Sequence, residues 1–294
     1  MKIRTISATV YVAVLIIFYV LKLFVHALCF DALTYAFAVI GTFEMLRAVK
    51  DKTTKPQRVI VTVFSLLCVP AVAVAELYGY GVLVLSAITL AFVLAVLTLL
   101  VFDYENTHLE NEGVALFSGI YPSVLVSFLV LVNHMQAPDA LSAFAFNSNL
   151  FLPLIFAISP LSDVFAYLVG CSLKKKFPKK LAPKISPNKT VVGAIGAVIG
   201  GVIASGAVYA IYGAVAGSFE NAVLWLPIFL ALGFVGALFT MFGDLVESGI
   251  KRKLGIKDMG KIMPGHGGVL DRIDGTMFMA IAVYFIFQFI YVFF

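Results

Sequence analysis

The sequence predicts an all-α integral membrane protein with about nine transmembrane helices. Of the 294 residues, 62% are hydrophobic and only 13% are charged, whereas soluble domains are about half apolar and about a quarter charged. The mean hydropathy is +1.03, and the apolar residues form runs of about 20, the length that crosses a bilayer. A water-soluble fold could not hide this much apolar surface, so that class of protein is excluded.

The expected helices follow the apolar runs in order. The first run starts after Lys2 and Arg4, and we interpret it as a span because no small-residue cleavage site of a signal peptide follows it. Small residues at Gly193, Gly196 and Gly200 have the spacing of helices in close contact within lipid. The nine candidate spans are residues 6–24, 26–47, 59–78, 80–101, 114–133, 149–172, 190–215, 222–246 and 272–293.

The basic residues predict the orientation of the chain in the membrane. Twenty of the 21 Lys and Arg residues lie at the N-terminus or in and beside alternate connecting segments, and only Lys22 falls elsewhere. Because basic loops stay in the cytoplasm, we expect the N-terminus to be cytoplasmic and the C-terminus to lie outside. The expected location is the cell inner (cytoplasmic) membrane. The cytoplasmic segments would be those near residues 48–58, 102–113, 173–189 and 247–271.

Chemically capable residues gather in the second half of the chain. Residues 1–150 are expected to form N-terminal transmembrane helices, and residues 151–294 a catalytic transmembrane region with cytoplasmic loops 173–189 and 247–271. Other polar residues are expected to be solvated: Asp103, Glu105, His108, Glu110, Glu112 and His134. The cysteines lie in apolar runs without metal-ligand spacing and are expected to be buried: Cys29, Cys68 and Cys171.

Five acids predict a cation site. Asp163 lies within an apolar run, where a carboxylate is costly and normally faces a cavity, a cation or a partner. Asp244 and Glu247 share a helical face at the end of one run, and Asp271 and Asp274 repeat that spacing at the start of the next. Clustered carboxylates repel unless a cation lies between them, and oxygen ligands favour Mg²⁺. A structural hydrogen bond of Asp163 and helix capping by Asp271 are the alternatives.

Basic and glycine-rich residues surround these acids. Glycine lets a backbone approach a ligand closely, and successive N–H groups can cradle phosphate oxygens. Together with the acids, the pattern indicates phosphoryl or nucleotidyl transfer at the membrane surface. The basic loop with Lys174–Lys184 is explained equally well by topology alone. The residues in the last loop are Lys251, Arg252, Lys257, Lys261, Gly265, His266, Gly267, Gly268 and Arg272.

The segment Ser248–Asp274 resembles the signature of the phosphatidate cytidylyltransferases (CDP-diacylglycerol synthases). That signature reads Ser-x-apolar-Lys-Arg, four residues, Lys-Asp, and then Pro-x-His-Gly-Gly-apolar-x-Asp-Arg-apolar-Asp. An upstream segment from Asp163 to Gly193 is also similar, and the closer resemblance covers roughly residues 151–294. Two positions depart from the family pattern: Met263 replaces a Leu, Ile or Phe, and Val192 stands where many members carry Glu.

The resemblance implies that CTP and phosphatidic acid react, with Mg²⁺, to CDP-diacylglycerol and pyrophosphate. It implies metal binding by four carboxylates: Asp163, Asp244, Asp271 and Asp274. It implies catalytic contacts to phosphates from Lys251, Arg252, Lys257, His266 and Arg272, and substrate binding by Ser186, Lys189, Thr190, Gly267 and Gly268. The expected partners are these two substrates and the lipid bilayer, not nucleic acid. A second cation such as K⁺ and a homodimer are left open.

Two other functions fit parts of the sequence. A related membrane transferase or kinase could use CTP with a polyprenol or another lipid phosphate. A transporter could also carry nine spans with acids, but it would show inverted repeats and acids near mid-span. The acids here cluster at the ends of apolar runs and no internal repeat is evident, which favours the enzyme.

Overall fold

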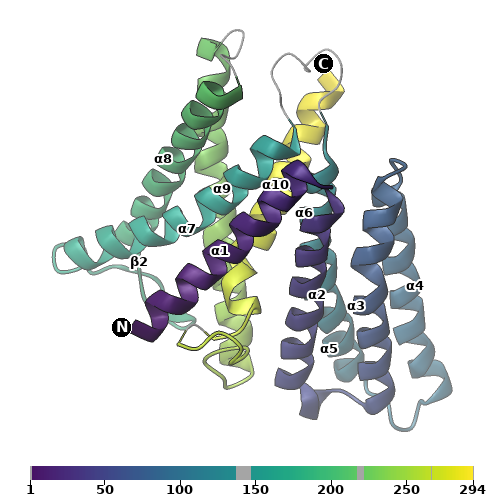
Figure 1. Cartoon of the computed structure of the whole chain (residues 1–294). Helices are drawn as coiled ribbons and strands as arrows, with labels where there is room; N and C mark the ends of the chain where they lie inside the picture. The colour runs from purple at the N-terminus through teal and green to yellow at the C-terminus, as the bar shows by residue number, and fades with distance from the viewer. Residues whose placement is uncertain (1, 137–146, 217–221, 266, 294) are drawn as a thin grey trace. The chain divides into compact units, whose positions relative to one another are not determined.

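The computed structural model describes residues 2–136, 147–216, 222–265 and 267–293 (Figure 1). Within these ranges nine helical segments are long and apolar enough to cross a membrane, which confirms the predicted helical, multi-pass class. Their bounds differ from the predicted spans by a few residues, as helix ends commonly do. The helices are α1 (Lys2–Phe24), α2 (Leu28–Ala48), α3 (Lys55–Glu76), α4 (Gly81–Phe102), α5 (Leu109–Gly119), α6 (Leu125–His134), α7 (Ser148–Leu173), α8 (Val191–Ala216), α9 (Ala222–Lys253) and α10 (Leu270–Phe293).

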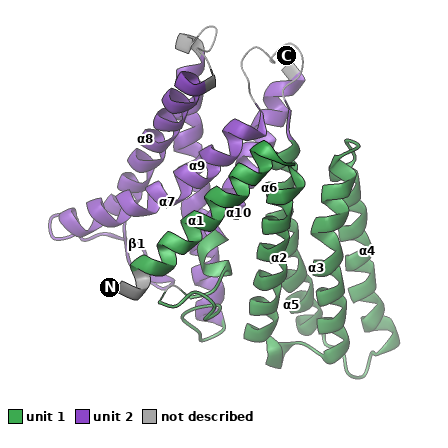
Figure 2. Cartoon of the chain, viewed as in Figure 1, with its two compact units in different colours: residues 1–134, 254–273 green, residues 135–253, 274–294 purple. Residues whose placement is uncertain are grey.

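The chain forms two compact units, which Figure 2 shows in different colours. Unit 1 consists of residues 1–134 and 254–273, and unit 2 of residues 135–253 and 274–294. The segment that resembles the family signature is therefore shared between them, because residues 254–273 belong to unit 1 and the residues on either side to unit 2. The functional division at residue 150 stays a prediction.

In unit 1, α3 begins with a capping box that also ties it to α5. Thr54 accepts the Gln57 N–H, and the Gln57 side chain accepts the Thr54 N–H at 2.8 Å. The Gln57 amide then donates to Glu112 at 3.1 Å. Glu112 is only 1% exposed, so the expectation that it is solvated is wrong. Its partner explains the difference, because a buried carboxylate is tolerated when it is hydrogen-bonded.

Hydroxyl groups join three helical segments inside unit 1. Thr42 on α2 hydrogen-bonds Ser65 on α3 at 2.9 Å and Ser123 at 3.1 Å. Ser123 lies in η2 (Ile120–Val124), a π-helical turn that links α5 and α6 into one span and contains Pro122. Proline lacks the N–H that would continue the helical ladder, so a local wide turn is expected there. Such interhelical hydrogen bonds hold helices together where lipid gives no hydrophobic drive.

A second buried polar group in unit 1 overturns another expectation. The His134 Nε2 lies 2.6 Å from the Asp31 carboxylate, and Asn133 donates to the same carboxylate at 2.8 Å. Asp31 is buried. His134 is therefore a partner of a buried acid and not a solvated loop residue, because α6 continues to position 134 and presents it to α2.

In unit 2, α8 packs tightly against α7 and α9 through glycines. A Cβ atom added at Gly196 would lie 2.7 Å from the carbonyl oxygen of Phe165 on α7. One at Gly201 would lie 2.6 Å from the carbonyl oxygen of Gly233 on α9. The predicted close contact along the glycine-rich span is confirmed, since only glycine allows the backbones to approach this closely.

Two further features of unit 2 position its polar residues. A small antiparallel hairpin of β1 (Lys180–Ala182) and β2 (Ser186–Thr190) joins α7 to α8, where an irregular loop was expected. The eighth span also continues beyond its predicted end at residue 246, because α9 runs to Lys253. Asp244 and Glu247 thus lie within the helix and not at its end.

Candidate active site

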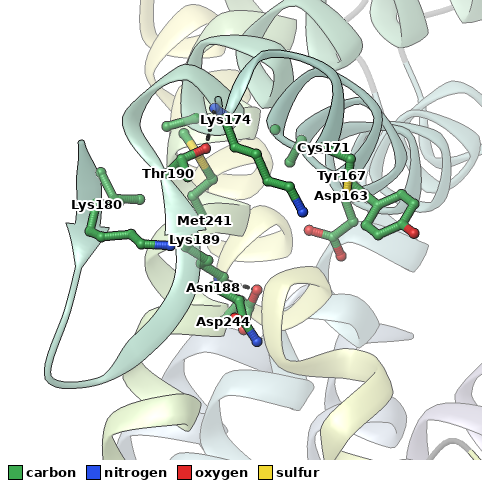
Figure 3. Close-up of a pocket in the computed structure, with 15 residues that line it drawn as sticks. Asp163, Tyr167, Cys171, Lys174, Lys180, Asn188, Lys189, Thr190, Met241 and Asp244 are labelled. Carbon is green, nitrogen blue, oxygen red and sulfur yellow. Dashed lines mark hydrogen bonds and ion pairs between the residues drawn. The ribbon is translucent and has the colours of Figure 1, made fainter. Parts of the chain in front are cut away.

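A cavity of about 550 Å³ with charged residues on its wall opens in unit 2 between α7, the hairpin, α8 and α9 (Figure 3). One face of α7 supplies Asp163, Ala166, Tyr167, Gly170 and Cys171, and Lys174 directly follows the helix. Cys171 is exposed there, so the expectation that it is buried is wrong. The hairpin and α8 supply Lys180, Leu181, Asn188, Lys189, Thr190, Gly193 and Ala194, and α9 supplies Met241 and Asp244. Of the predicted site residues, the fold therefore gathers Asp163, Lys189, Thr190 and Asp244 around one cavity.

The N-terminus of α8 faces this cavity. Thr190 ends β2, and its side-chain oxygen accepts the Gly193 N–H at 3.1 Å, as a helix cap does. Thr190, Gly193 and Ala194 all line the cavity. Helix N-termini attract anions, because their first N–H groups have no helical partner and carry the positive end of the helix dipole. The N-terminus of α8, which directly follows the hairpin, thus forms an anion-attracting part of the cavity wall.

Lysines and aspartates both line the cavity. Lys189 on β2 forms an ion pair with Asp244 on α9, and Ser248 donates to the same carboxylate at 3.3 Å. In Figure 3 the side chain of Lys174 points toward the carboxylate of Asp163. Asp244 thus has a lysine partner on the cavity wall, and phosphate oxygens can compete with its carboxylate for the Lys189 ammonium group.

A second acidic group adjoins Asp244 in unit 2. Asp274, at the unit 2 end of the signature segment, lies within electrostatic range of Glu247, Asp244 and Lys251. Lys251 also contacts Glu247 at 3.3 Å. Helices α9 and α10 approach closely here, because a Cβ at Gly243 would lie 2.5 Å from the Asp274 carbonyl oxygen. Neighbouring carboxylates repel unless a positive charge or a proton lies between them, and Lys251 supplies one positive charge here.

These acids fit a magnesium ion that is shared with a substrate. In the part of the chain that the structure describes, no three His, Cys, Asp or Glu side chains form a complete metal cage. Mg²⁺ seldom uses one, because it keeps several waters and commonly binds one or two carboxylates together with substrate phosphates. Asp244 and Asp274 offer such carboxylates and lie within electrostatic range of each other.

The remaining predicted residues of unit 2 do not line the cavity. Arg252 donates to the Ile185 carbonyl at 3.2 Å and is otherwise exposed. Ser186 is half-buried in β2, and Lys251 and Arg252 lie in the last turn of α9.

Residues 254–273 form the glycine-rich loop of unit 1 and the start of α10. The predicted substrate-binding residues Gly267 and Gly268 lie here, and Gly267 has a φ of +90° that favours glycine. Asp271 accepts the N–H groups of Met259 and Gly268 at 2.9 and 2.8 Å with one oxygen. The Gly268 N–H is thus directed to the protein's own carboxylate in this conformation. Lys257 and Arg272 are exposed, and His266 lies outside the described residues.

Sequence reasoning missed several residues of the cavity. It treated Lys174 and Lys180 only as part of a basic loop, and it gave no role to Tyr167 or Asn188. A signal for the α7 residues was present, because positions 163, 167, 170, 171 and 174 recur at the three- and four-residue spacing of one helical face. Asn188 could be placed only once the hairpin was known.

Comparisons with known proteins match most of the chain. The model of the cytidylyltransferase family matches residues 2–290. The phosphatidate cytidylyltransferase of Helicobacter pylori (strain J99) is 32% identical over 266 residues, which cover 90% of this chain and 85% of that protein. Proteins of the same name from Staphylococcus saprophyticus and Staphylococcus aureus are 41% and 44% identical over 124 residues, or 42% of this chain and 44% of each relative.

Proposed function

Because the chain belongs to the cytidylyltransferase family, we propose that it transfers the cytidylyl group of CTP to phosphatidic acid, giving CDP-diacylglycerol and pyrophosphate. Family membership confirms the resemblance inferred from residues 248–274. The observation that carries the substrate assignment is the Helicobacter pylori relative, a phosphatidate cytidylyltransferase that aligns with nine-tenths of this chain. The cavity of unit 2 supports it with lysines and a helix N-terminus suited to phosphates.

The chemistry asks the protein mainly to hold anions together. A phosphatidate oxygen attacks the α-phosphorus of CTP, the new P–O bond forms, and the bond from that phosphorus to the pyrophosphate oxygen breaks. The attacking oxygen is already anionic, so no general base is needed. Two anions must meet, and catalysis therefore comes from positioning and charge neutralisation. Lys174, Lys180, Lys189 and the N-terminus of α8 would supply the positive charge on the cavity wall.

We assign divalent-cation binding to Asp244 and Asp274, with Asp163 and Asp271 as further ligands. When bound, Mg²⁺ would neutralise phosphate charge during the transfer. The ion pair of Lys189 with Asp244 would then open, so that the lysine turns to a phosphate oxygen while the carboxylate holds the ion. A second cation such as K⁺ belongs to the same proposal. The predicted phosphate contacts of Lys251, Arg252, Lys257, His266 and Arg272 complete it.

The proposal includes an orientation in the cell inner membrane. CTP is cytosolic, and Lys and Arg gather in the segments around residues 48–58, 173–189 and 247–271. The N-terminus and these segments would face the cytoplasm and the C-terminus the opposite side. Self-association into a homodimer and the absence of a nucleic-acid partner are expected but carry no part of the argument.

The test is a product assay on purified protein in detergent. Incubation with CTP, phosphatidic acid and Mg²⁺ should give CDP-diacylglycerol and pyrophosphate in equal amounts, and EDTA should stop the reaction. A parallel reaction offers a polyprenol in place of phosphatidic acid. Product from the polyprenol but none from phosphatidic acid would overturn the substrate assignment and favour a kinase-like activity.

A further inference from the structure

Glu44, far from the signature segment in sequence, contacts the glycine-rich loop directly. It lies on α2, is only 3% exposed, and belongs with the loop to unit 1. One carboxylate oxygen accepts the Val269 N–H at 3.1 Å, and the other accepts the Leu270 N–H at 2.9 Å. These two N–H groups lie at the start of helix α10, where the helix dipole favours a negative charge. A glutamate from the first half of the chain thus caps the helix that ends the loop.

Two glycines of the loop make room for this carboxylate. A Cβ atom at Gly260 or at Gly268 would collide with the carboxylate of Glu44. The two positions are eight residues apart in the sequence. Glu44 therefore lies against two separate parts of the loop, one at Gly260 and one at Gly268. Gly268 is not one of the glycines with positive φ, which means that lack of space explains it and backbone strain does not. Larger residues at either position would displace Glu44.

A second carboxylate holds the same loop from within. Asp271 accepts the N–H groups of Met259 and Gly268. The backbone also closes on itself, because the Met263 N–H donates to the Gly267 carbonyl at 2.9 Å. Four backbone N–H groups between residues 259 and 270 therefore donate to two buried carboxylates. Hydrogen bonds to a charged acceptor are stronger than neutral ones, so together they fix the course of the loop.

We propose that Glu44 is a positioning residue that holds the glycine-rich loop, residues 257–272, in the conformation that presents its cations to phosphate. The N–H groups of the loop point to the two carboxylates. The side chains of Lys257, Lys261 and Arg272 are exposed and remain available to phosphate. Glu44 itself touches no substrate. The link to phosphate rests on the proposed function, whereas the ordering of the loop does not.

Position 44 requires a carboxylate because it faces two hydrogen-bond donors, the N–H groups of Val269 and Leu270. Both partners are N–H groups, and an ionised carboxylate accepts on both oxygens. The substitution Glu44→Gln keeps the size of the side chain but turns an NH₂ group toward an N–H. One hydrogen bond is lost and one buried donor is left facing another, which costs more than a missing neutral hydrogen bond.

The chain offers a matched control in Glu112. This residue is also a buried glutamate within a membrane span of unit 1, but its hydrogen bond goes to Gln57 and not to the loop. The substitution Glu112→Gln therefore removes a buried carboxylate of the same unit while leaving the Glu44 contacts in place. Any general effect of losing a buried charge appears in both variants.

The experiment follows hydrogen–deuterium exchange of the loop amides and trypsin cleavage after Lys257 and Lys261 in full-length protein in detergent. In Glu44→Gln we expect exchange within residues 257–272 and cleavage there to be about tenfold faster or more, with the other helices of unit 1 still protected. In Glu112→Gln the loop should behave as in the unaltered protein. If Glu44→Gln does not fold, Glu44→Asp replaces it, because the shorter side chain cannot reach both N–H groups.

Activity provides the second reading. The kcat/KM for the transferase reaction should fall about tenfold or more in Glu44→Gln, and much less in Glu112→Gln. Unchanged loop exchange in the Glu44 variants, or equal loosening of the loop in Glu112→Gln, would overturn the proposal. An unaltered protein without transferase activity would instead overturn the proposed function, and the exchange measurement would still decide the role of Glu44.

Discussion

Lys189 and Asp244 neutralise each other on the wall of the cavity in unit 2. If the lysine turns to a phosphate oxygen when CTP binds, Lys189→Met should raise the KM for CTP and lower kcat/KM about tenfold to a hundredfold, since charged hydrogen bonds are each worth about 1.5–3 kcal/mol. Steady-state kinetics with CTP varied would measure this. The control is Lys184→Met, because Lys184 is an exposed residue of the same hairpin that does not line the cavity. Equal effects of the two substitutions would show that only the charge of the hairpin matters.

The sequence left two roles open for Asp271, metal binding and helix capping, and a substitution can distinguish them. Its carboxylate already accepts two backbone N–H groups, and the metal proposal adds a cation. Asp271→Asn keeps an oxygen for capping but loses the charge, so a metal ligand should lose a hundredfold or more in rate, about 3 kcal/mol. The Mg²⁺ concentration that gives half-maximal rate should rise, as it should in Asp274→Asn. Near-normal activity with unchanged Mg²⁺ dependence would mean that Asp271 only holds the loop.

Individual functional residues could be predicted to different extents. Asp163 and Asp244 were predicted from their residue types and positions, Lys189 and Thr190 from the family resemblance, and all four line one cavity. Glu44 could not be predicted, because its partners are backbone N–H groups more than 200 positions away. A hydrogen bond to backbone leaves no complementary residue type in the sequence by which to recognise it.

The packing of α7 against α8 gives a prediction about helix contact. Gly196→Ala would push a methyl group against the Phe165 carbonyl and the Val169 side chain, and overpacking of this kind costs about 1–3 kcal/mol. Gly249→Ala is the control, because a Cβ at this helical glycine of the same unit has no neighbour within 4 Å. Alanine should stabilise that helix by about 0.5–1 kcal/mol. Thermal unfolding of both variants is measured in the same detergent. We expect a Tm below that of the unaltered protein for Gly196→Ala and not for Gly249→Ala. A Tm that rises in both would contradict the close packing.

The helices were predictable because hydropathy reports the bilayer directly, and each apolar run became a span. The hairpin was not, because β1 and β2 have only three and five residues and are rich in Lys, Pro and Asn. Strands this short are determined by pairing with each other, as Lys180 with Thr190, and not by a periodic pattern. The burial of Glu112 was missed for a similar reason, since its partner Gln57 lies on another helix.

The whole molecule has two compact units, and neither is one continuous stretch of chain. Residues 254–273 belong to unit 1, although the residues before and after them belong to unit 2. A division by sequence position places residues 151–294 together, because apolar runs show where helices are and not which helices pack together. The hydrogen bonds that the loop N–H groups donate to Glu44 indicate what joins residues 254–273 to the first half of the chain. Such long-range contacts carry no local sequence signal.

The orientation of the whole chain can be tested by cysteine labelling in intact cells. In a background with Cys29, Cys68 and Cys171 replaced by Ser, Lys180→Cys and Phe294→Cys provide one probe on each expected side. A membrane-impermeant maleimide added outside should reach position 294 and not position 180, because the basic segments should stay in the cytoplasm. Permeabilised cells give the control for reactivity. Labelling of position 180 from outside would overturn the topology.

The central claim, that a cytidylyl group moves to the lipid, is tested most directly by the fate of two phosphorus labels. Purified protein is given phosphatidic acid and CTP labelled in either the α- or the γ-phosphate, and the lipid product is extracted. Cytidylyl transfer breaks the bond between the α- and β-phosphates, so the α-label should enter the lipid and the γ-label should leave with pyrophosphate. A γ-label in the lipid, with the α-label left on CDP, would show phosphoryl transfer and would contradict the account.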